Sequence, residues 1–246
     1  MARQRLDIAL VERGLAPTRE RARALVLAGQ VLVNGKPARK AGEPVKNADD
    51  IGLATPDHPY VGRGGMKLAH ALETFQIDVT GRRAIDIGAS TGGFTDVLLQ
   101  RGVGSVVSLD VGYGQLEWKL RNDPRVVVLE RVNARYLSPD QLPATHRRFD
   151  LATIDVSFIS LRLILPVLPP LLETGADIVA LVKPQFEAGR NEVGPGGVVR
   201  SPEIHERVVS EVTAAADTVG LRRIAATPSP IEGAEGNREF LLHLRI

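Results

Sequence analysis

The chain has 246 residues, of which 43% are hydrophobic and 24% charged, and its formal net charge is +2. This composition supports a folded core and excludes disorder as the default state, while the absence of cysteine excludes disulfides, thiol nucleophiles and cysteine-bound zinc. The N-terminus is charged where a signal peptide is apolar, and the longest apolar run, residues 163–172, holds three prolines and is too short to span a bilayer. We therefore expect a soluble, cytoplasmic protein with no metal site and no contact with a membrane. The sequence does not indicate the oligomeric state, and a monomer is the default expectation.

Charge is distributed unevenly along the chain. Residues 1–50 carry ten Arg and Lys against six Asp and Glu, a net charge of +4, so the remaining 196 residues carry a net charge of −2. A basic segment of this kind either binds a polyanion or is a solvated charged surface, and charge alone does not decide between the two.

Two short helices are predicted within the basic segment. Apolar residues at helical spacing indicate a first helix closed by Gly14 and a second helix that begins at Pro17 and ends at Gly29. Arg19 and Arg23 are four residues apart on the second helix and share one face. Such a face suits the phosphate backbone beside a wide, shallow RNA groove.

A hairpin follows, because an alternating segment leads into Asn34-Gly35, the strongest short hairpin signal. Residues 1–54 resemble the small RNA-binding domain first known in ribosomal protein S-four. The matching positions are residues 5–7, 14–15, 18–19, 22, 29–35 and 40. The resemblance implies that Arg5, Arg19 and Lys40 face RNA, although long basic side chains also serve only to cover apolar surface.

A linker is predicted at residues 55–62, between the small domain at 1–54 and a larger domain at 63–246. This stretch is rich in Pro and Gly and has little apolar periodicity. The helix that follows carries Lys67 in its first turn, where a lysine opposes the helix dipole. A solvated lysine and a functional lysine both fit this position.

Apolar strands alternate with helix-length segments from residue 83 onward. The predicted strands lie at residues 84–88, 106–110, 126–129, 150–154, 178–182, 221–226 and 240–244. The alternation predicts a parallel sheet with helices on both faces. The last two strands have no helix between them, which predicts a terminal antiparallel pair and favours a methyltransferase sheet over most dinucleotide dehydrogenases.

A turn rich in small residues follows the first of these strands and is the candidate cofactor site. Its members are Gly88, Ala89, Ser90, Thr91, Gly92 and Gly93. Asp110 ends the second strand about 20 residues later, where a carboxylate accepts both hydroxyls of a ribose. NAD and S-adenosylmethionine both carry that ribose, but the turn lacks the G-x-G-x-x-G pattern, which favours S-adenosylmethionine. Asn133 stands where an adenine contact is expected, and a simple turn residue fits there equally well.

Four charged residues are predicted to meet at one edge of the sheet. Asp155 and Lys183 end the fourth and fifth strands, and ligands of open α/β sheets bind outside such ends. Glu239 begins the last, antiparallel strand and therefore lies at the same edge, over which Lys67 is able to fold. A mutual ion pair between Asp155 and Lys183 that only holds the sheet together is the alternative.

The whole chain resembles the TlyA family of FtsJ-type 2′-O-ribose methyltransferases. The resemblance rests on Lys67, Asp155, Lys183 and Glu239, which resemble the Lys-Asp-Lys-Glu tetrad of that type and are therefore expected to be catalytic. It rests also on the turn at 88–95 and on residues 110–116 and 182–187. It implies a Rossmann-like class I methyltransferase of α/β class, with a seven-stranded, mostly parallel sheet and a terminal antiparallel hairpin, preceded by the small α+β RNA-binding domain.

The same resemblance implies a function. It is S-adenosylmethionine-dependent methylation of a cytidine 2′-hydroxyl in ribosomal RNA, with Asp155 beside the methyl donor. The residues do not decide which ribosomal subunit is modified; the large-subunit RNA is the expected target, and methylation of the small-subunit RNA as well is the alternative. Some family members carry a legacy hemolysin label, but nothing in this sequence favours a pore.

The chemistry needs a group that takes or steers the proton of a poorly nucleophilic hydroxyl. Lys183 is the best candidate for the base, and Asp155 and Glu239 would hold the two lysines in place. A Gly-rich stretch at 189–200 is interpreted as a cap over the target nucleotide, with Phe186 as a stacking surface, although a plain flexible loop fits as well.

Three other functions remain as alternatives. The first is a non-catalytic RNA-binding or ribosome assembly factor that retains a methyltransferase fold. An NAD-dependent oxidoreductase and a membrane-lytic protein are less favoured, because of the turn sequence and the missing apolar segment respectively.

Overall fold

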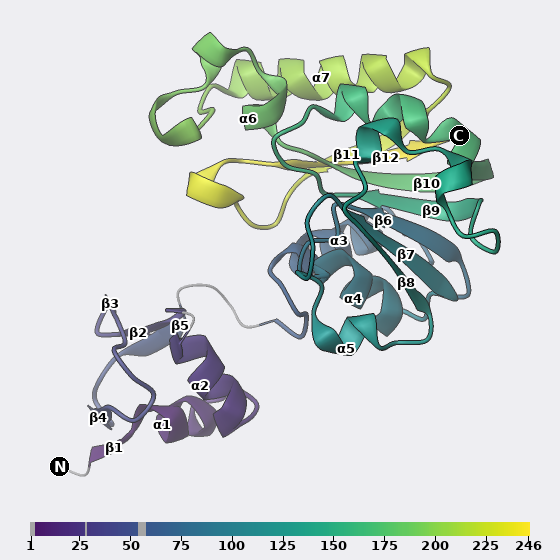
Figure 1. Ribbon diagram of the computed structural model, residues 1–246. Helices are drawn as coiled ribbons and strands as arrows, with labels where there is room; N and C mark the ends of the chain where they lie inside the picture. The colour runs from purple at the N-terminus through teal and green to yellow at the C-terminus, as the bar shows by residue number, and fades with distance from the viewer. Residues whose placement is uncertain (1–2, 28, 54–57) are drawn as a thin grey trace. The chain divides into compact units, whose positions relative to one another are not determined.

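The computed structural model describes residues 3–27, 29–53 and 58–246. The chain forms two compact units, the first ending at Pro59 and the second beginning at Tyr60 (Figure 1). Residues 55–57 of the predicted linker lie outside the described residues.

The first unit packs two helices against short strands. Its elements are β1 (Arg3–Arg5), α1 (Leu6–Glu12), α2 (Arg19–Leu27), β2 (Val31–Val33), β3 (Lys36–Pro37), β4 (Pro44–Lys46) and β5 (Ile51–Leu53). β2 pairs antiparallel with β3 and β5, and β1 pairs with β4. Asn34 and Gly35 both adopt positive φ between β2 and β3, so the predicted hairpin is confirmed. The strands β1, β4 and β5 are too short to leave a periodic signal, and sequence reasoning missed them.

A buried carboxylate organises the charged surface of this unit. Asp7, at the start of α1, is fully buried and accepts hydrogen bonds from Arg5 Nε at 3.0 Å, Arg19 Nη2 at 3.2 Å and Arg23 Nε at 3.2 Å. The three guanidinium groups, that of Arg5 first, hold the pKa of Asp7 far below its usual range. About half of each arginine side chain stays exposed. The three guanidinium groups are therefore held around the buried Asp7 carboxylate while part of each arginine side chain stays in contact with solvent.

The second unit is built on a sheet that has seven strands within residues 60–246, in the spatial order β11-β12-β10-β9-β6-β7-β8. The strands are β6 (Arg83–Ile87), β7 (Ser105–Asp110), β8 (Val126–Glu130), β9 (Phe149–Ile154), β10 (Leu172–Val182), β11 (Arg222–Pro228) and β12 (Phe240–Arg245). β12 runs antiparallel to both β10 and β11, whereas β6 to β10 pair in parallel. The predicted fold and its terminal antiparallel pair are confirmed.

Helices cover both faces of this sheet (Figure 1). They are α3 (Gly64–Thr74), α4 (Gly93–Gln100), α5 (Trp118–Arg121), α6 (Pro184–Glu187) and α7 (Pro202–Thr218). In β10, Ile178 and Ala180 belong to the apolar cluster that includes α7, while Val179 and Leu181 belong to the cluster that includes α3 and α4. This explains the unbroken apolar run of that strand, since successive side chains point to opposite, equally buried faces.

β10 is longer than the sequence indicated. It begins at Leu172 rather than near Ile178, and its pairing with β9 shifts register between Leu172 and Asp177. The exposed polar residues in that irregular stretch interrupt the apolar pattern on which the prediction relied. No helix among the described residues is long and apolar enough to cross a membrane.

The substitution Asp7→Asn tests whether the buried carboxylate holds the first unit together. We expect it to lower the free energy of unfolding of this unit by roughly 1–3 kcal/mol, because charge-assisted hydrogen bonds to three arginines are lost while the half-exposed arginines regain water. Hydrogen exchange of the α1 amides in the intact chain measures the change. Asp50→Asn, an equal charge change at an exposed site of the same unit, is the control. Equal exchange in both variants would contradict the prediction.

Candidate active site

The turn after β6 approaches the end of β9 so closely that it requires glycine. Gly88 has φ +87°, and a Cβ placed there would lie 2.5 Å from the backbone carbonyl oxygen of Asp155. Its N–H donates to the carbonyl of Leu109 at 2.8 Å, which ties the turn to β7 as well. The ends of β6, β7 and β9 are therefore joined through this one residue.

A cavity of about 510 Å³ opens beside the turn. Its walls include Gly88, Ser90, Leu109, Asp110, Val111, Gln115, Val132, Asn133, Asp155, Ser157, Phe158 and Ile164. Asp110 accepts hydrogen bonds from the backbone N–H of Ser90 at 2.8 Å and of Gly112 at 2.7 Å, so its carboxylate is fixed at the cavity wall. Leu109, Val132 and Ile164 supply an apolar wall.

A second, smaller cavity of about 190 Å³ adjoins the first. Ala89, Thr91 and Gly93 of the predicted turn line it, together with Lys183 and Phe94. The two cavities share Gly88, Ser90, Asp155 and Ser157. A ligand in the larger cavity and a ligand in the smaller one would therefore meet at Asp155.

Two predicted cofactor residues have structural roles. A Cβ on Gly92 would lie 2.3 Å from Leu120 and 2.7 Å from Leu116, and Gly92 lines neither cavity, so it is a packing position. Asn133 lines the larger cavity, and its side chain also accepts a hydrogen bond from Arg135 N at 3.0 Å, which caps the next turn. The turn role of Asn133 is thus observed, and its contact with adenine stays a prediction.

The larger cavity fits a nucleoside ligand such as the adenosyl part of S-adenosylmethionine. A fixed carboxylate suits a ribose diol, the apolar wall suits a base, and the glycine turn lets a ligand approach the backbone closely. Among the described residues, no cluster of His, Asp and Glu has the arrangement of a metal site.

The four charged residues form two ion pairs. Lys183 Nζ lies 2.6 Å from Asp155 Oδ1 and donates to Ser157 Oγ at 2.9 Å. Lys67 Nζ lies 2.5 Å from Glu239 Oε2, and both of those side chains are buried. Only the first pair lines the smaller cavity, as does Gly64, one turn before Lys67 on α3. The predicted meeting of Asp155 with Lys183 is therefore an ion pair at a cavity wall.

An exposed aromatic residue stands at the mouth of the larger cavity and was missed from the sequence. Phe158 is 92% exposed and has φ +63°, a strained conformation for a bulky residue. Its ring packs on Phe186, with centroids 5.1 Å apart. Ser157 was missed as well. The only available signal was that both residues closely follow Asp155 at a strand end.

A buried carboxyl group, that of Asp86, precedes the turn at 88–93 and connects three elements. Asp86 in β6 is fully buried and accepts hydrogen bonds from Thr95 Oγ1 at 2.7 Å and from Thr153 Oγ1 at 2.9 Å. Burial raises the pKa of Asp86 to about 6 despite these two hydrogen bonds. The residue links β6, α4 and β9 directly behind the turn.

Comparison with known proteins assigns the second unit to a methyltransferase family. The family model of FtsJ-like methyltransferases matches residues 60–246, which is most of the chain. This chain belongs to the FtsJ-like methyltransferase family. The model of the S4 domain matches residues 4–51 in the first unit.

Two proteins similar to this FtsJ-like methyltransferase match nearly the whole chain, and a third shares the fold over part of it. The chain is 50% identical over 244 residues to the 16S/23S rRNA (cytidine-2′-O)-methyltransferase TlyA of Mycobacterium tuberculosis, covering 99% of this chain and 90% of that protein. A solved structure from Streptococcus thermophilus that carries a hemolysin name is 47% identical, with a TM-score of 0.78, covering 100% of this chain and 89% of that one. An S-adenosylmethionine-dependent methyltransferase from Mesorhizobium loti shares the fold at 16% identity, with a TM-score of 0.56 and coverage of 75% of this chain and 100% of that one.

The raised pKa of Asp86 predicts a pH dependence of stability. Because the folded pKa, about 6, lies above the unfolded value of 3.8, the favourable contribution is complete below pH 3.8 and is lost as the pH rises through 6. The variant Asp86→Asn lacks this titrating carboxyl group. The free energy of unfolding of the variant minus that of the parent should therefore rise by roughly 2–3 kcal/mol between pH 4 and pH 7.

Urea unfolding of both proteins across this pH range measures the difference. Asp217→Asn, on the exposed side of α7, is the control and should follow the parent at every pH. A stability difference between Asp86→Asn and the parent that stays constant from pH 4 to pH 7 would disprove the assignment.

Proposed function

We propose that this chain methylates the 2′-hydroxyl of cytidine in ribosomal RNA with S-adenosylmethionine as methyl donor. The observation that carries the proposal is the position of Lys183, held by Asp155 and Ser157 at the wall where a nucleoside-sized cavity meets a smaller one. The family match and the name of the Mycobacterium tuberculosis relative support this chemistry.

Residues of the larger cavity would hold the methyl donor. Asp110 would accept the ribose hydroxyls, Asn133 would contact the base, and Gly88 would allow the close approach of the ligand to the backbone. S-adenosylmethionine supplies a methyl group on a sulfonium, which is already a good leaving group. The main task left to the protein is therefore to place and deprotonate the acceptor hydroxyl.

Lys183 is proposed to handle the proton of the 2′-hydroxyl. Its Nζ atom lies 2.6 Å from Asp155 Oδ1 at the wall of the smaller cavity, where it would accept the proton that leaves the hydroxyl as the methyl group is transferred. Ser157 holds the same Nζ atom from the other side and keeps it directed toward the smaller cavity.

The pair Lys67–Glu239 has a supporting role in this proposal. Both side chains are buried and lie 2.5 Å apart, so each neutralises the other near the end of β10, where Lys183 also lies. Glu239 also closely faces Gly233, where a Cβ would lie 2.1 Å from Oε1, so the segment before β12 fixes its orientation.

The target base is proposed to stack on the aromatic pair at the cavity mouth. Phe158 offers an almost fully exposed ring, and Phe186 supports it from behind, only three residues after Lys183. A base held there would bring its ribose toward the smaller cavity. The Gly-rich stretch at 189–200 follows α6 and remains the proposed cap over the nucleotide.

The first unit is proposed to hold the RNA. Arg5 and Arg19 are anchored on Asp7 while about half of each side chain is exposed, so their free N–H groups are available to phosphates. Lys40 is exposed, and the carbonyl of its neighbour Ala41 accepts the Asp7 N–H at 2.9 Å, which places it near the arginines. The match to the S4 domain supports this assignment.

The proposed substrates are the large-subunit RNA and, in addition, the small-subunit RNA, which places the protein with ribosomal subunits in the cytoplasm. The name of the Mycobacterium tuberculosis relative includes both RNAs. Transfer of a radiolabelled methyl group to each purified subunit, followed by mapping of 2′-O-methylated riboses, tests the proposal. RNA binding without any label transfer would instead favour the non-catalytic assembly factor.

Substitution of Lys183 tests its role as the base. Lys183→Ala should lower the single-turnover rate of methyl transfer by about 10²–10⁴-fold, the usual contribution of a general base, while the Kd for S-adenosylmethionine stays within a few-fold. Lys183→Arg keeps a cation beside Asp155 but does not deprotonate, so it should be as slow as Lys183→Ala. Near-normal turnover in the arginine variant would show that charge, not proton transfer, matters.

Substitution of Phe158 tests the stacking platform. Because base stacking on an aromatic side chain contributes about 1–3 kcal/mol, Phe158→Ala should reduce kcat/KM for RNA by roughly 5- to 150-fold, and Phe158→Trp should restore it. Ile224→Ala, another exposed apolar residue on the edge strand β11, is the control. Equal kcat/KM in the parent and Phe158→Ala would remove this residue from the proposed site.

A further inference from the structure

The two chain segments that leave β9 and β10 touch at successive positions. The segment after β9 starts with Asp155 and carries Phe158, and the segment after β10 starts with Lys183 and carries Phe186. The contacts are Asp155–Lys183 at 2.6 Å, Ser157–Lys183 at 2.9 Å, Phe158–Phe186 at 5.1 Å between centroids, and Ser160–Glu187 at 2.5 Å. The first three are assigned to the proposed site, whereas the fourth has no role there.

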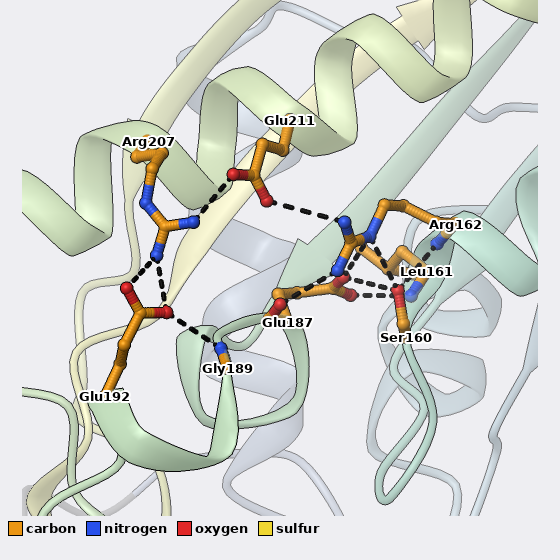
Figure 2. Close-up of polar contacts among 8 residues, drawn as sticks. All are labelled: Ser160, Leu161, Arg162, Glu187, Gly189, Glu192, Arg207 and Glu211. Carbon is orange, nitrogen blue, oxygen red and sulfur yellow. Dashed lines mark hydrogen bonds and ion pairs between the residues drawn. The ribbon is translucent and has the colours of Figure 1, made fainter.

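Glu187 closes this series from a buried position. Its side chain is 2% exposed, and it accepts hydrogen bonds from Ser160 Oγ at 2.5 Å and from the backbone N–H of Leu161 at 2.6 Å (Figure 2). Arg162 Nε lies 3.4 Å away, and Arg162 also donates to the Glu187 backbone carbonyl at 2.9 Å. Three successive residues of the β9 segment are thus attached to a single residue of the β10 segment.

A second group of contacts continues outward to α7 but differs in exposure. Arg162 Nη1 lies 3.4 Å from Glu211. Arg207 lies 2.7 Å from Glu211 and 2.6 Å from Glu192, so it links these two carboxylates (Figure 2). These side chains are 34–44% exposed, so each such pair contributes little on its own. Glu211 therefore offers a matched comparison, since it contacts the same arginine from the solvent side.

Burying the carboxyl group of Glu187 costs desolvation free energy, so its contribution lies in fixing the positions of the neighbouring segments rather than in stability. Burial raises the pKa of this carboxyl group, and a well-packed apolar side chain would fill such a site without that desolvation penalty. Its bonds fix the backbone at Leu161, three residues beyond the strained Phe158, and it ends the single helical turn that begins directly after Lys183. Loss of this attachment would let the lysine and the aromatic platform shift relative to each other.

We propose that Glu187 is a positioning residue, which holds the β9 and β10 segments together so that Lys183 keeps its place at the smaller cavity and Phe158 keeps its place at the adjoining larger one. The inference rests on the proposed function. It assigns to Glu187 no contact with the RNA or with the methyl donor. Displacements of about 1 Å in such an arrangement cost on the order of 10²-fold in rate.

The test compares Glu187→Ala, Glu187→Gln and Glu211→Gln in the full chain. Glu187→Ala should lower the single-turnover methyl-transfer rate by 10- to 100-fold at saturating RNA, with the Kd for S-adenosylmethionine within twofold of the parent. Glu187→Gln keeps an acceptor for Leu161 and a partner for Ser160, so it should stay within threefold of the parent rate. Glu211→Gln should be unchanged.

Two results would overturn the inference. One is a Glu187→Ala rate within twofold of the parent, and the other is a parallel loss of methyl-donor binding and rate, which indicates only structural support. If Glu187→Ala does not fold, Ser160→Ala removes the other end of the same contact, and it should then lower the rate while donor binding stays unchanged.

Failure of the proposed function is recognised separately. If the parent protein transfers no methyl group to any ribosomal RNA, the proposed function is wrong. Hydrogen exchange of residues 157–163 then decides on the attachment itself. It should be at least tenfold faster in Glu187→Ala and unchanged in Glu211→Gln, and equal exchange in the parent and Glu187→Ala would overturn the inference.

Discussion

The ion pair between Asp155 and Lys183 joins the ends of two neighbouring parallel strands, and the candidate active site is arranged around it. Because β9 and β10 run in the same direction, the residues that follow them emerge at one edge of the sheet. The turn at Gly88 presses against the backbone of Asp155, so the nucleoside-sized cavity and the ion pair share a wall. The position of both cavities relative to the ion pair thus depends on where β9 ends.

Several buried charged side chains lie at this end of the sheet. Besides the central ion pair, the structure buries Lys67 with Glu239, Glu187 with Ser160 and Leu161, and Asp86 with two threonines. Such groups cost free energy to desolvate, and apolar residues would often serve stability as well. Side chains held by such contacts agree with a site whose polar groups are fixed before the substrate arrives.

The first unit also contains a buried charged group, which there holds arginine side chains at the surface. Asp7 is buried beneath three half-exposed arginines, so the carboxylate restricts the cations without removing them from solvent. Long arginine side chains lose conformational entropy when they bind phosphate, and prior anchoring reduces that cost. The net charge of +4 in the first fifty residues therefore includes an ordered cluster as well as freely solvated side chains.

The sequence by itself determined the elements whose signal is local. Apolar runs and alternation located the strands that carry the site, Asn34-Gly35 located the hairpin, and the strand ends placed Asp155 and Lys183 at one edge. Only the tertiary structure decided which side chains pair, since Lys67 meets Glu239 across 172 residues and Lys183 meets Ser157 across 26. It also inserted β12 between β10 and β11 and brought Glu187 against Ser160. These contacts depend on how distant segments pack, and no local pattern of residues records that packing.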